Sequence, residues 1–388
     1  MTDRNGARLF GLLLLLMSLT ALLIGSGCST DTVRGKDLPI HSGSEETGVF
    51  SVDEEAERIV ASMTDAEKVG QLLMIGIQGT DVSADTVCML HEYNIGNIIL
   101  FDRNMHNRDQ VRTLTSDLQK EAGQKVPLFI GVDEEGGDIA RMRSDLSVPP
   151  SQRETGLSGN AEEAKDYAFS MGMQLKDIGI NLNFAPVADV SGSDSRSFGD
   201  SPDRVFDFVS NAGYGYERAH IVYVLKHFPG IGQAVVDSHR AGSVISAPRM
   251  ELLRRDVQPF SRMFASHDMN RYMVLVSHLT YAGLDGDRPA SLSYAVMTNL
   301  LRKELQYKGL IITDDMEMGA VTELYSFEEL GVRSILAGAD IIMVCHEYDH
   351  EQKVYNGILQ ALRQGRIGRE RLDASVKRIV KTKLLNLR

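Results

Sequence analysis

Tryptophan is absent from the 388 residues, and cysteine occurs only three times. Stacking of a ligand on an aromatic ring would therefore fall to the 12 tyrosines and 13 phenylalanines. Two of the cysteines, Cys88 and Cys345, lie in or beside apolar segments, which favours buried free thiols over a disulfide. Positive charge is not in excess either, because the formal net charge is −12. Since no basic stripe is present to neutralise phosphates, we expect no nucleic-acid partner.

Residues 1–28 are predicted to be a processing segment rather than part of the fold. Arg4 and Arg8 precede a long apolar run that ends in small residues, which is typical of a secretory signal. Cys28 follows this run directly and resembles the lipidated cysteine of a bacterial lipobox, although Gly25 stands where leucine is usual. Plain signal cleavage and an uncleaved single-span anchor are the alternatives. We predict an exported lipoprotein, held by a lipid on Cys28 at the extracytoplasmic face of the cell membrane.

The segment 29–52 is polar and rich in Ser, Thr and Gly, which predicts a tether between membrane and domain. No Pro- or Ser-rich linker interrupts the chain after it. The economical interpretation is therefore one catalytic domain that covers residues 53–388.

Eight short apolar runs alternate with helix-like segments in this domain. Each run is almost continuously hydrophobic, the pattern of a strand buried on both faces of a parallel sheet. The alternation predicts an α/β fold, a single (β/α)8 TIM-type barrel, with an open doubly wound sheet as the alternative. The helical stretch 350–388 is expected to close or cap the barrel. The runs are 71–79, 94–101, 126–137, 180–190, 221–230, 272–284, 309–319 and 339–344.

Polar residues gather where five of these runs end. Since the carboxyl ends of barrel strands meet at one face, we expect these side chains to form a site there. A packing account alone predicts no such bias. The segments concerned are 133–137, 183–189, Lys226-His227, Ser277-His278 and 313–315.

Several kinds of catalytic site are disfavoured because the residues or motifs that they need are missing. The first two runs contain no histidine, whereas metal-dependent barrel hydrolases usually present His-x-His on an early strand. There is no G-x-S-x-G elbow and no Cys/His pair in a plausible context. We therefore expect no metal and no cofactor. The remaining groups are a strand-end carboxylate, a loop histidine and hydrogen-bonding groups suited to hydroxyls, which fit acyl or glycosyl transfer.

A series of motifs carries a resemblance to a known family. From about residue 53 to 388 the chain resembles the barrel domain of glycoside hydrolase family 3, in its bacterial β-N-acetylhexosaminidase branch. The resemblance implies a retaining exo-β-N-acetylglucosaminidase that releases terminal GlcNAc from peptidoglycan fragments or chitin-type oligosaccharides. The motifs are GVDEEGG (131–137), NFAPVADV (183–190), RSFG (196–199), KHFPGIG (226–232), DSH (237–239), SHLTYAGLD (277–285), PASLS (289–293), ITDDMEMGAV (312–321) and AGAD (337–340).

The same resemblance implies catalytic roles. Asp314 would be the nucleophile that forms a covalent glycosyl-enzyme, hydrolysed later with net retention. Its neighbour Asp315 must point to the opposite face of the strand, so a structural role is favoured for it. His239 would be the acid/base, oriented by Asp237 two residues earlier on the loop.

Further residues would bind the sugar or line its subsite. Ordinary ion pairing around a barrel mouth is the alternative for most of them. The predicted set is Asp133, Arg141, Arg196, Lys226, His227 and His278.

Two positions depart from the family pattern. Ile231 stands where a histidine is usual, and Asp138 stands where a basic residue is common. Both bear on substrate preference, since an extra negative charge near the entrance could disfavour an acidic aglycone. Two alternative functions stay open. A histidine acid/base would not repel phosphate, which allows a β-N-acetylglucosaminide phosphorylase, and a non-catalytic cell-surface sugar-binding lipoprotein is the third possibility.

Overall fold

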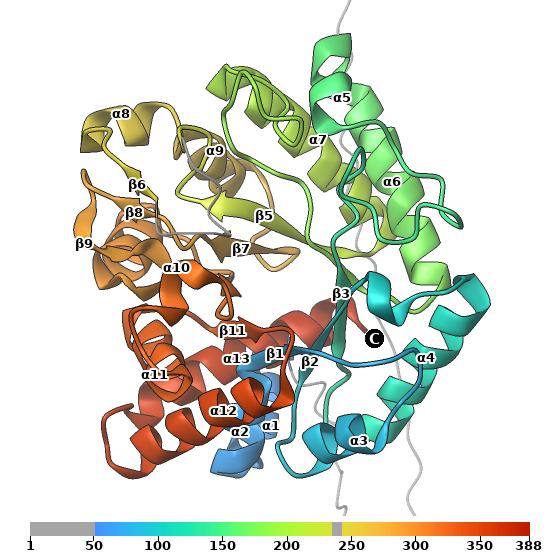
Figure 1. Cartoon of the computed structure of the whole chain (residues 1–388), viewed down its shortest axis with the longest axis vertical. Helices are drawn as coiled ribbons and strands as arrows, with labels where there is room; N and C mark the ends of the chain where they lie inside the picture. Colours follow the sequence, from blue (N-terminus) through green and yellow to red (C-terminus); the bar gives the residue numbers. More distant parts are fainter. Residues whose placement is uncertain (1–50, 235–242) are drawn as a thin grey trace, which may run out of the picture. The chain divides into compact units, whose positions relative to one another are not determined.

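The computed structural model describes residues 51–234 and 243–388 (Figure 1). Three predicted functional residues, Cys28, Asp237 and His239, lie outside the described residues. In the described part of the chain, no helix is long and apolar enough to cross a membrane.

Eight parallel strands close into a barrel in the order β1-β11-β10-β7-β5-β4-β3-β2. Each predicted apolar run contains one of these strands, so the predicted (β/α)8 fold is confirmed. Helices surround the barrel in Figure 1, which explains why its strand residues are buried on both faces. The strands are β1 (Leu73–Gly76), β2 (Asn97–Leu100), β3 (Phe129–Val132), β4 (Leu182–Asn183), β5 (Val222–Phe228), β7 (Tyr272–Val276), β10 (Leu310–Asp315) and β11 (Ile341–Val344).

The helices begin and end largely where local signals place them. In α4, Asn107 Oδ1 accepts a hydrogen bond of 3.0 Å from Gln110 N–H, and Gly123 ends the helix at φ +50°. The helix-like segment 248–266, between the fifth and sixth apolar runs, forms two helices, since α9 starts anew with Pro259 in its first turn. The α-helices are α1 (Val52–Ala61), α2 (Asp65–Gln71), α3 (Ala84–His91), α4 (Arg108–Ala122), α5 (Gln152–Ser158), α6 (Ala161–Asp177), α7 (Pro202–Ala219), α8 (Arg249–Arg254), α9 (Gln258–Ser266), α10 (Gly319–Thr322), α11 (Phe327–Ala337), α12 (Tyr348–Arg363) and α13 (Arg369–Asn386).

Two features of the fold differ from a regular barrel. The helix between β9 and β10, η3 (Ala295–Glu304), has π-type hydrogen bonding. A small sheet lies outside the barrel and contains β6 (Val244–Ile245), β8 (Thr280–Tyr281) and β9 (Asp285–Pro289). Strand β6 pairs with β8 in parallel. This pairing joins the described segment that begins at residue 243 to the segment that follows β7.

The last helix, α13, closes the N-terminal end of the barrel. Lys383 Nζ donates hydrogen bonds of 2.8 Å to Gln71 Oε1 and to Gly96 O, which lie just before β1 and β2. Asn386 Nδ2 donates one of 2.9 Å to Asn270 O, just before β7. Burial among neutral acceptors lowers the pKa of Lys383 well below its ordinary value. The expectation that the C-terminal helices cap the barrel therefore holds.

A buried carboxylate at the start of β11 ties α13 and η3 to the barrel wall. Asp340 is fully buried and contacts Arg302 of η3, Arg378 of α13 at 2.9 Å and Arg371 of α13 at 3.9 Å. Burial alone would raise the pKa of Asp340, but the three guanidinium groups outweigh it and hold the pKa below its ordinary value. The pairing thus makes a charged side chain tolerable in the interior.

Both described cysteines are free thiols. Cys345 is buried, as predicted, and burial raises its pKa well above the ordinary value. Cys88 is exposed, so the prediction that it is buried is wrong. It lies on α3, between buried Thr86 and Met89, and points away from the core that both of them face.

Replacement of Asp340 by Asn should destabilise the fold strongly, because three arginines lose their buried counter-charge. We expect Asp340→Asn to lower the free energy of unfolding by about 3–5 kcal/mol, measured by urea denaturation. Glu57→Gln is the matched control, since Glu57 pairs with Lys377 of the same α13 at a largely exposed site. An Asp340→Asn protein as stable as this control would contradict the role given to the buried pair.

Candidate active site

A pocket opens at the carboxyl ends of the barrel strands and encloses about 730 Å³, including solvent at its mouth. Every predicted site residue in the described part of the chain lines it. The pocket therefore gathers side chains that are up to 181 positions apart in the sequence, between Asp133 and Asp314. The seven are Asp133, Arg141, Arg196, Lys226, His227, His278 and Asp314.

A buried charge cluster forms one wall of the pocket. Lys226 Nζ lies 2.6 Å from Asp133 Oδ1 and 2.7 Å from Glu135 Oε1. Arg196 binds the same Glu135 with two hydrogen bonds, from Nε at 2.9 Å and from Nη2 at 2.8 Å. Burial would raise the pKa of Glu135, but the charges of Lys226 and Arg196 lower it to about 2. Glu135 is thus an ionised carboxylate that holds both cations in place.

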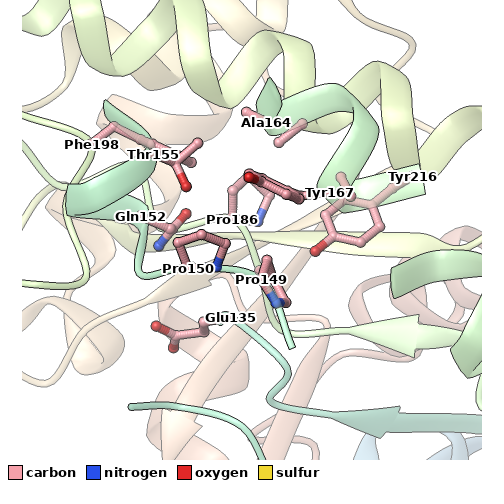
Figure 2. A pocket seen from close by; sticks show the side chains of 13 residues that line it. Glu135, Pro149, Pro150, Gln152, Thr155, Ala164, Tyr167, Pro186, Phe198 and Tyr216 are labelled. Atoms are coloured by element: carbon pink, nitrogen blue, oxygen red, sulfur yellow. The ribbon is translucent and has the colours of Figure 1, made fainter. Parts of the chain in front are cut away.

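Glu135 had no predicted role, although it belongs to the acidic run at the end of β3. It also lines a second cavity, of about 360 Å³ (Figure 2). Figure 2 shows Glu135 at one edge of that cavity, next to the rings of Pro149 and Pro150. Gln152 in the same wall donates to Arg196 O at 2.6 Å and accepts from Val187 N–H at 3.0 Å. The second cavity therefore adjoins the groups that hold the loop bearing Arg196.

His227 is held on two sides. Its Nδ1 lies 2.8 Å from Asp189 Oδ2, and its Nε2 lies 3.3 Å from Arg196 Nη2. Asp189 is fully buried and does not line the pocket. Sequence reasoning placed Asp189 in a polar strand end but assigned it no role, because nothing local in the sequence links it to His227.

Asp314 and Asp315 diverge at the end of β10, as strand alternation predicts. Asp314 is half-buried, faces the pocket and accepts a 3.0 Å hydrogen bond from Asp315 N–H. Burial would raise the pKa of Asp314, but the nearby His278, the charge of Lys226 and the N–H of Asp315 hold it below the ordinary value. The Asp315 carboxylate lies 3.1 Å from His346 Nε2 instead. Of these two neighbours, only Asp314 presents its carboxylate to the pocket.

His278 lines the pocket without a free ring nitrogen. Its Nε2 lies 2.8 Å from Asp315 O, and its Nδ1 lies 2.6 Å from Ser291 Oγ. Because a carbonyl oxygen only accepts, Nε2 carries the hydrogen. The ring therefore anchors the backbone beside Asp314, and it can offer a ligand only its carbon edge in this arrangement.

The structure also shows where Arg141 lies, and where the two residues that depart from the family pattern, Ile231 and Asp138, lie. Arg141 Nη2 lies 3.5 Å from Asp133 Oδ2 at the rim of the pocket. Ile231 lines the pocket, and its N–H donates to Asp189 Oδ1 at 2.9 Å. Asp138 is exposed at a turn that a 3.1 Å hydrogen bond closes between Ile139 N–H and Gly136 O, and it does not line the pocket.

Residues 51–234 and 243–388 contain no group of three or more His, Cys, Asp or Glu side chains arranged to hold a metal ion. Within this part of the chain, the polar groups of the pocket are instead paired with one another. The site as described therefore offers carboxylates, cations and one imidazole to an uncharged, hydroxyl-rich ligand.

Loss of the Glu135 charge should destabilise the protein in a pH-dependent way. A carboxyl group whose pKa falls from 4.5 to about 2 on folding contributes about 3 kcal/mol above pH 4.5, which is lost as the pH falls toward 2. We expect Glu135→Gln to be less stable by at least about this amount at pH 7 and to approach the parent only near pH 2. Denaturant unfolding at several pH values measures this, with Glu162→Gln at an exposed ion pair as control. A difference that does not change with pH would be inconsistent with the ionised pair.

The domain is similar to known proteins in sequence and in fold. The model of the glycosyl hydrolase family 3 N-terminal domain matches residues 64–382. Beta-hexosaminidase LpqI of Mycobacterium tuberculosis is 32% identical over 341 residues, which are 84% of each chain. Beta-hexosaminidase A of Pseudoalteromonas piscicida is 30% identical over 332 residues, 76% of this chain but 54% of that protein, so the chain spans about half of it.

Solved structures show the same relationship. A glycoside hydrolase family 3 beta-N-acetylglucosaminidase from Paenibacillus sp. str. FPU-7 is 35% identical, with a TM-score of 0.82 over 84% of this chain and 63% of that chain. The M. tuberculosis LpqI structure is 30% identical, with a TM-score of 0.77 over 84% of this chain and 96% of that one. The family match covers most of the domain and the fold agrees throughout it. The chain belongs to glycoside hydrolase family 3.

Proposed function

We propose that the protein is a retaining exo-β-N-acetylglucosaminidase that removes terminal GlcNAc from oligosaccharides. The observation that carries the proposal is the Asp314 carboxylate, which is held ionised at the carboxyl end of β10 and faces a pocket lined by hydroxyl-binding groups. The relatives named above support GlcNAc as the proposed terminal sugar, since each is named for β-hexosaminidase or β-N-acetylglucosaminidase activity.

In the proposed reaction, Asp314 attacks the anomeric carbon and the glycosidic bond breaks. A glycosyl ester of Asp314 forms, and water then hydrolyses it with net retention of configuration. Lys226 and Arg196 donate hydrogen bonds to sugar hydroxyls, and Asp133 accepts them, because these groups line the pocket with polar atoms. Their mutual ion pairs hold them in position before substrate arrives.

The proton is proposed to come from His239, with Asp237 orienting its ring. The described residues on either side of this pair lie close to the site. Ile231 lines the pocket, Ala234 N–H donates to Ile231 O at 2.8 Å, and Ser243 O accepts from Thr280 N–H at 3.0 Å. A histidine suits this task because its ordinary pKa of about 6.5 lies near neutral operating pH.

The substrate class and the cellular location are proposed from the sequence. GlcNAc-terminated peptidoglycan fragments and chitin-type oligosaccharides both present the terminal sugar that this pocket would take. A lipid on Cys28 and the polar segment 29–52 would place the enzyme on the extracytoplasmic face of the membrane.

Replacement of the nucleophile tests the proposal directly. The full chain should release p-nitrophenol from its N-acetyl-β-glucosaminide, and Asp314→Asn should lower this rate at least about 10³-fold because the amide cannot attack. Asp315→Asn, the matched control, should keep most of the rate. A 5-fluoro-GlcNAc fluoride should label the peptide that carries Asp314, as detected by mass spectrometry.

Three other outcomes would replace the proposal. Equal losses in the two variants would show that Asp314 is not distinguished from its neighbour. A sugar 1-phosphate that accumulates only with added phosphate would indicate a phosphorylase. Binding of GlcNAc glycosides without turnover by the parent protein would indicate a sugar-binding lipoprotein.

Removal of the proposed acid should depend on the leaving group. We expect His239→Ala to reduce the formation of the glycosyl-enzyme by about 10²–10⁴-fold for an alkyl or sugar leaving group, which needs a proton. The loss should be much smaller for p-nitrophenol, which leaves as an anion. Pre-steady-state kinetics with the two substrate classes compares these losses, and an equal loss for both would assign the proton transfer to another residue.

A further inference from the structure

One buried carboxylate beneath the pocket collects three hydrogen bonds from the segment that carries the sugar-binding residues. Asp189 Oδ2 lies 2.8 Å from His227 Nδ1, and Asp189 Oδ1 accepts from His227 N–H at 3.2 Å and from Ile231 N–H at 2.9 Å. The carboxylate is fully buried and does not line the pocket. It therefore acts on a ligand only through the groups that it holds.

The contacts on the two sides of His227 determine which of its ring nitrogens carries a hydrogen. Arg196 has only donors, so the 3.3 Å contact from its Nη2 requires a lone pair on His227 Nε2. The hydrogen then resides on Nδ1, where the ionised Asp189 accepts it. In this arrangement the imidazole is neutral, and the lone pair of its Nε2 accepts from Arg196.

An amide at position 189 could not make the same contacts. A carboxylate accepts with both oxygens, whereas an asparagine has one accepting oxygen and one donating nitrogen. If that nitrogen faced His227 Nδ1, the imidazole would have to carry its hydrogen on Nε2, opposite the donor of Arg196. If it faced the backbone instead, the N–H groups of His227 and Ile231 would be buried without an acceptor.

We propose that Asp189 is a positioning residue that keeps His227 a neutral hydrogen-bond acceptor for Arg196 and so fixes the guanidinium group that lines the pocket. The pocket then has a fixed polarity: Lys226 and Arg196 donate to the ligand, while Asp133 accepts from it. This arrangement selects a ligand whose neighbouring hydroxyls both donate and accept, as those of a sugar ring do. The part that concerns substrate rests on the proposed function, and the part that concerns the imidazole does not.

The state of the imidazole can be measured without substrate. The sample is full-length protein, labelled with ¹⁵N-histidine and solubilised in detergent, and its ¹⁵N NMR spectrum is recorded. The signals that are missing from the spectrum of His227→Gln are assigned to His227. We expect a protonated Nδ1 and an unprotonated Nε2 at neutral pH, and a shift toward protonated Nε2 in Asp189→Asn. A protonated Nε2 in the parent, or identical ¹⁵N shifts in parent and Asp189→Asn, would overturn the proposal.

Kinetics then test the consequence for the substrate. Asp189→Asn should raise KM by about 10- to 100-fold and change kcat less, because an interaction present before and during the reaction is weakened. In the His227→Gln background the same substitution should raise KM no further, since Asp189 acts through His227. Additive effects of the two substitutions would overturn the proposal.

Ser197→Ala is the matched control for loss of structure. Ser197 Oγ donates to Asp189 O at 2.7 Å in the same buried loop but does not contact His227. It should lower the midpoint of unfolding while KM and the ¹⁵N shifts of His227 stay at parental values. The same rise of KM in Ser197→Ala would reduce Asp189 to a structural residue. If the parent turns over no GlcNAc glycoside, the proposed function fails, and the NMR measurement still decides the role of Asp189.

Discussion

The ion pairs of Glu135 with Lys226 and Arg196 are the interaction on which the site depends. Burying a cation without a counter-charge would cost several kcal/mol, and Glu135 supplies that charge to both cations in the wall of the pocket, with Asp133 as a second partner of Lys226. The three residues come from three strands or from the segments that follow them. Glu135 follows β3, Arg196 follows β4, and Lys226 lies near the end of β5. The cluster can therefore form only when β3, β4 and β5 lie side by side, which couples the chemistry of the pocket to the fold.

The two ends of the barrel have different roles. At the N-terminal end, α13 covers the strand starts, and Asp340 joins it to η3 through arginines. At the C-terminal end, the charged groups face an open pocket, which is the side where barrels of this type carry their sites. The loops at the pocket thus carry the charged groups, while the contacts of α13 stabilise the opposite end.

The pattern of the sequence predicted the strands and most of the pocket, but not how the pocket is supported. Continuous apolar runs reveal buried strands, and the residue after a strand end is placed by the barrel geometry, so Lys226, His227 and Asp314 could be predicted. The roles of Glu135 and Asp189 could not, because their partners are 61 and 38 residues away. Similarly, no local signal shows that both ring nitrogens of His278 are already engaged.

The sequence by itself determined the number and order of the strands, the face on which polar groups collect and the family. These follow from local periodicity and from residues adjacent in the chain. Only the tertiary structure decided which charges pair, that the partner of Asp315 is His346, and which nitrogen of His227 accepts from Arg196. These features depend on contacts between distant strands, and the energy of a buried charge depends on every group around it.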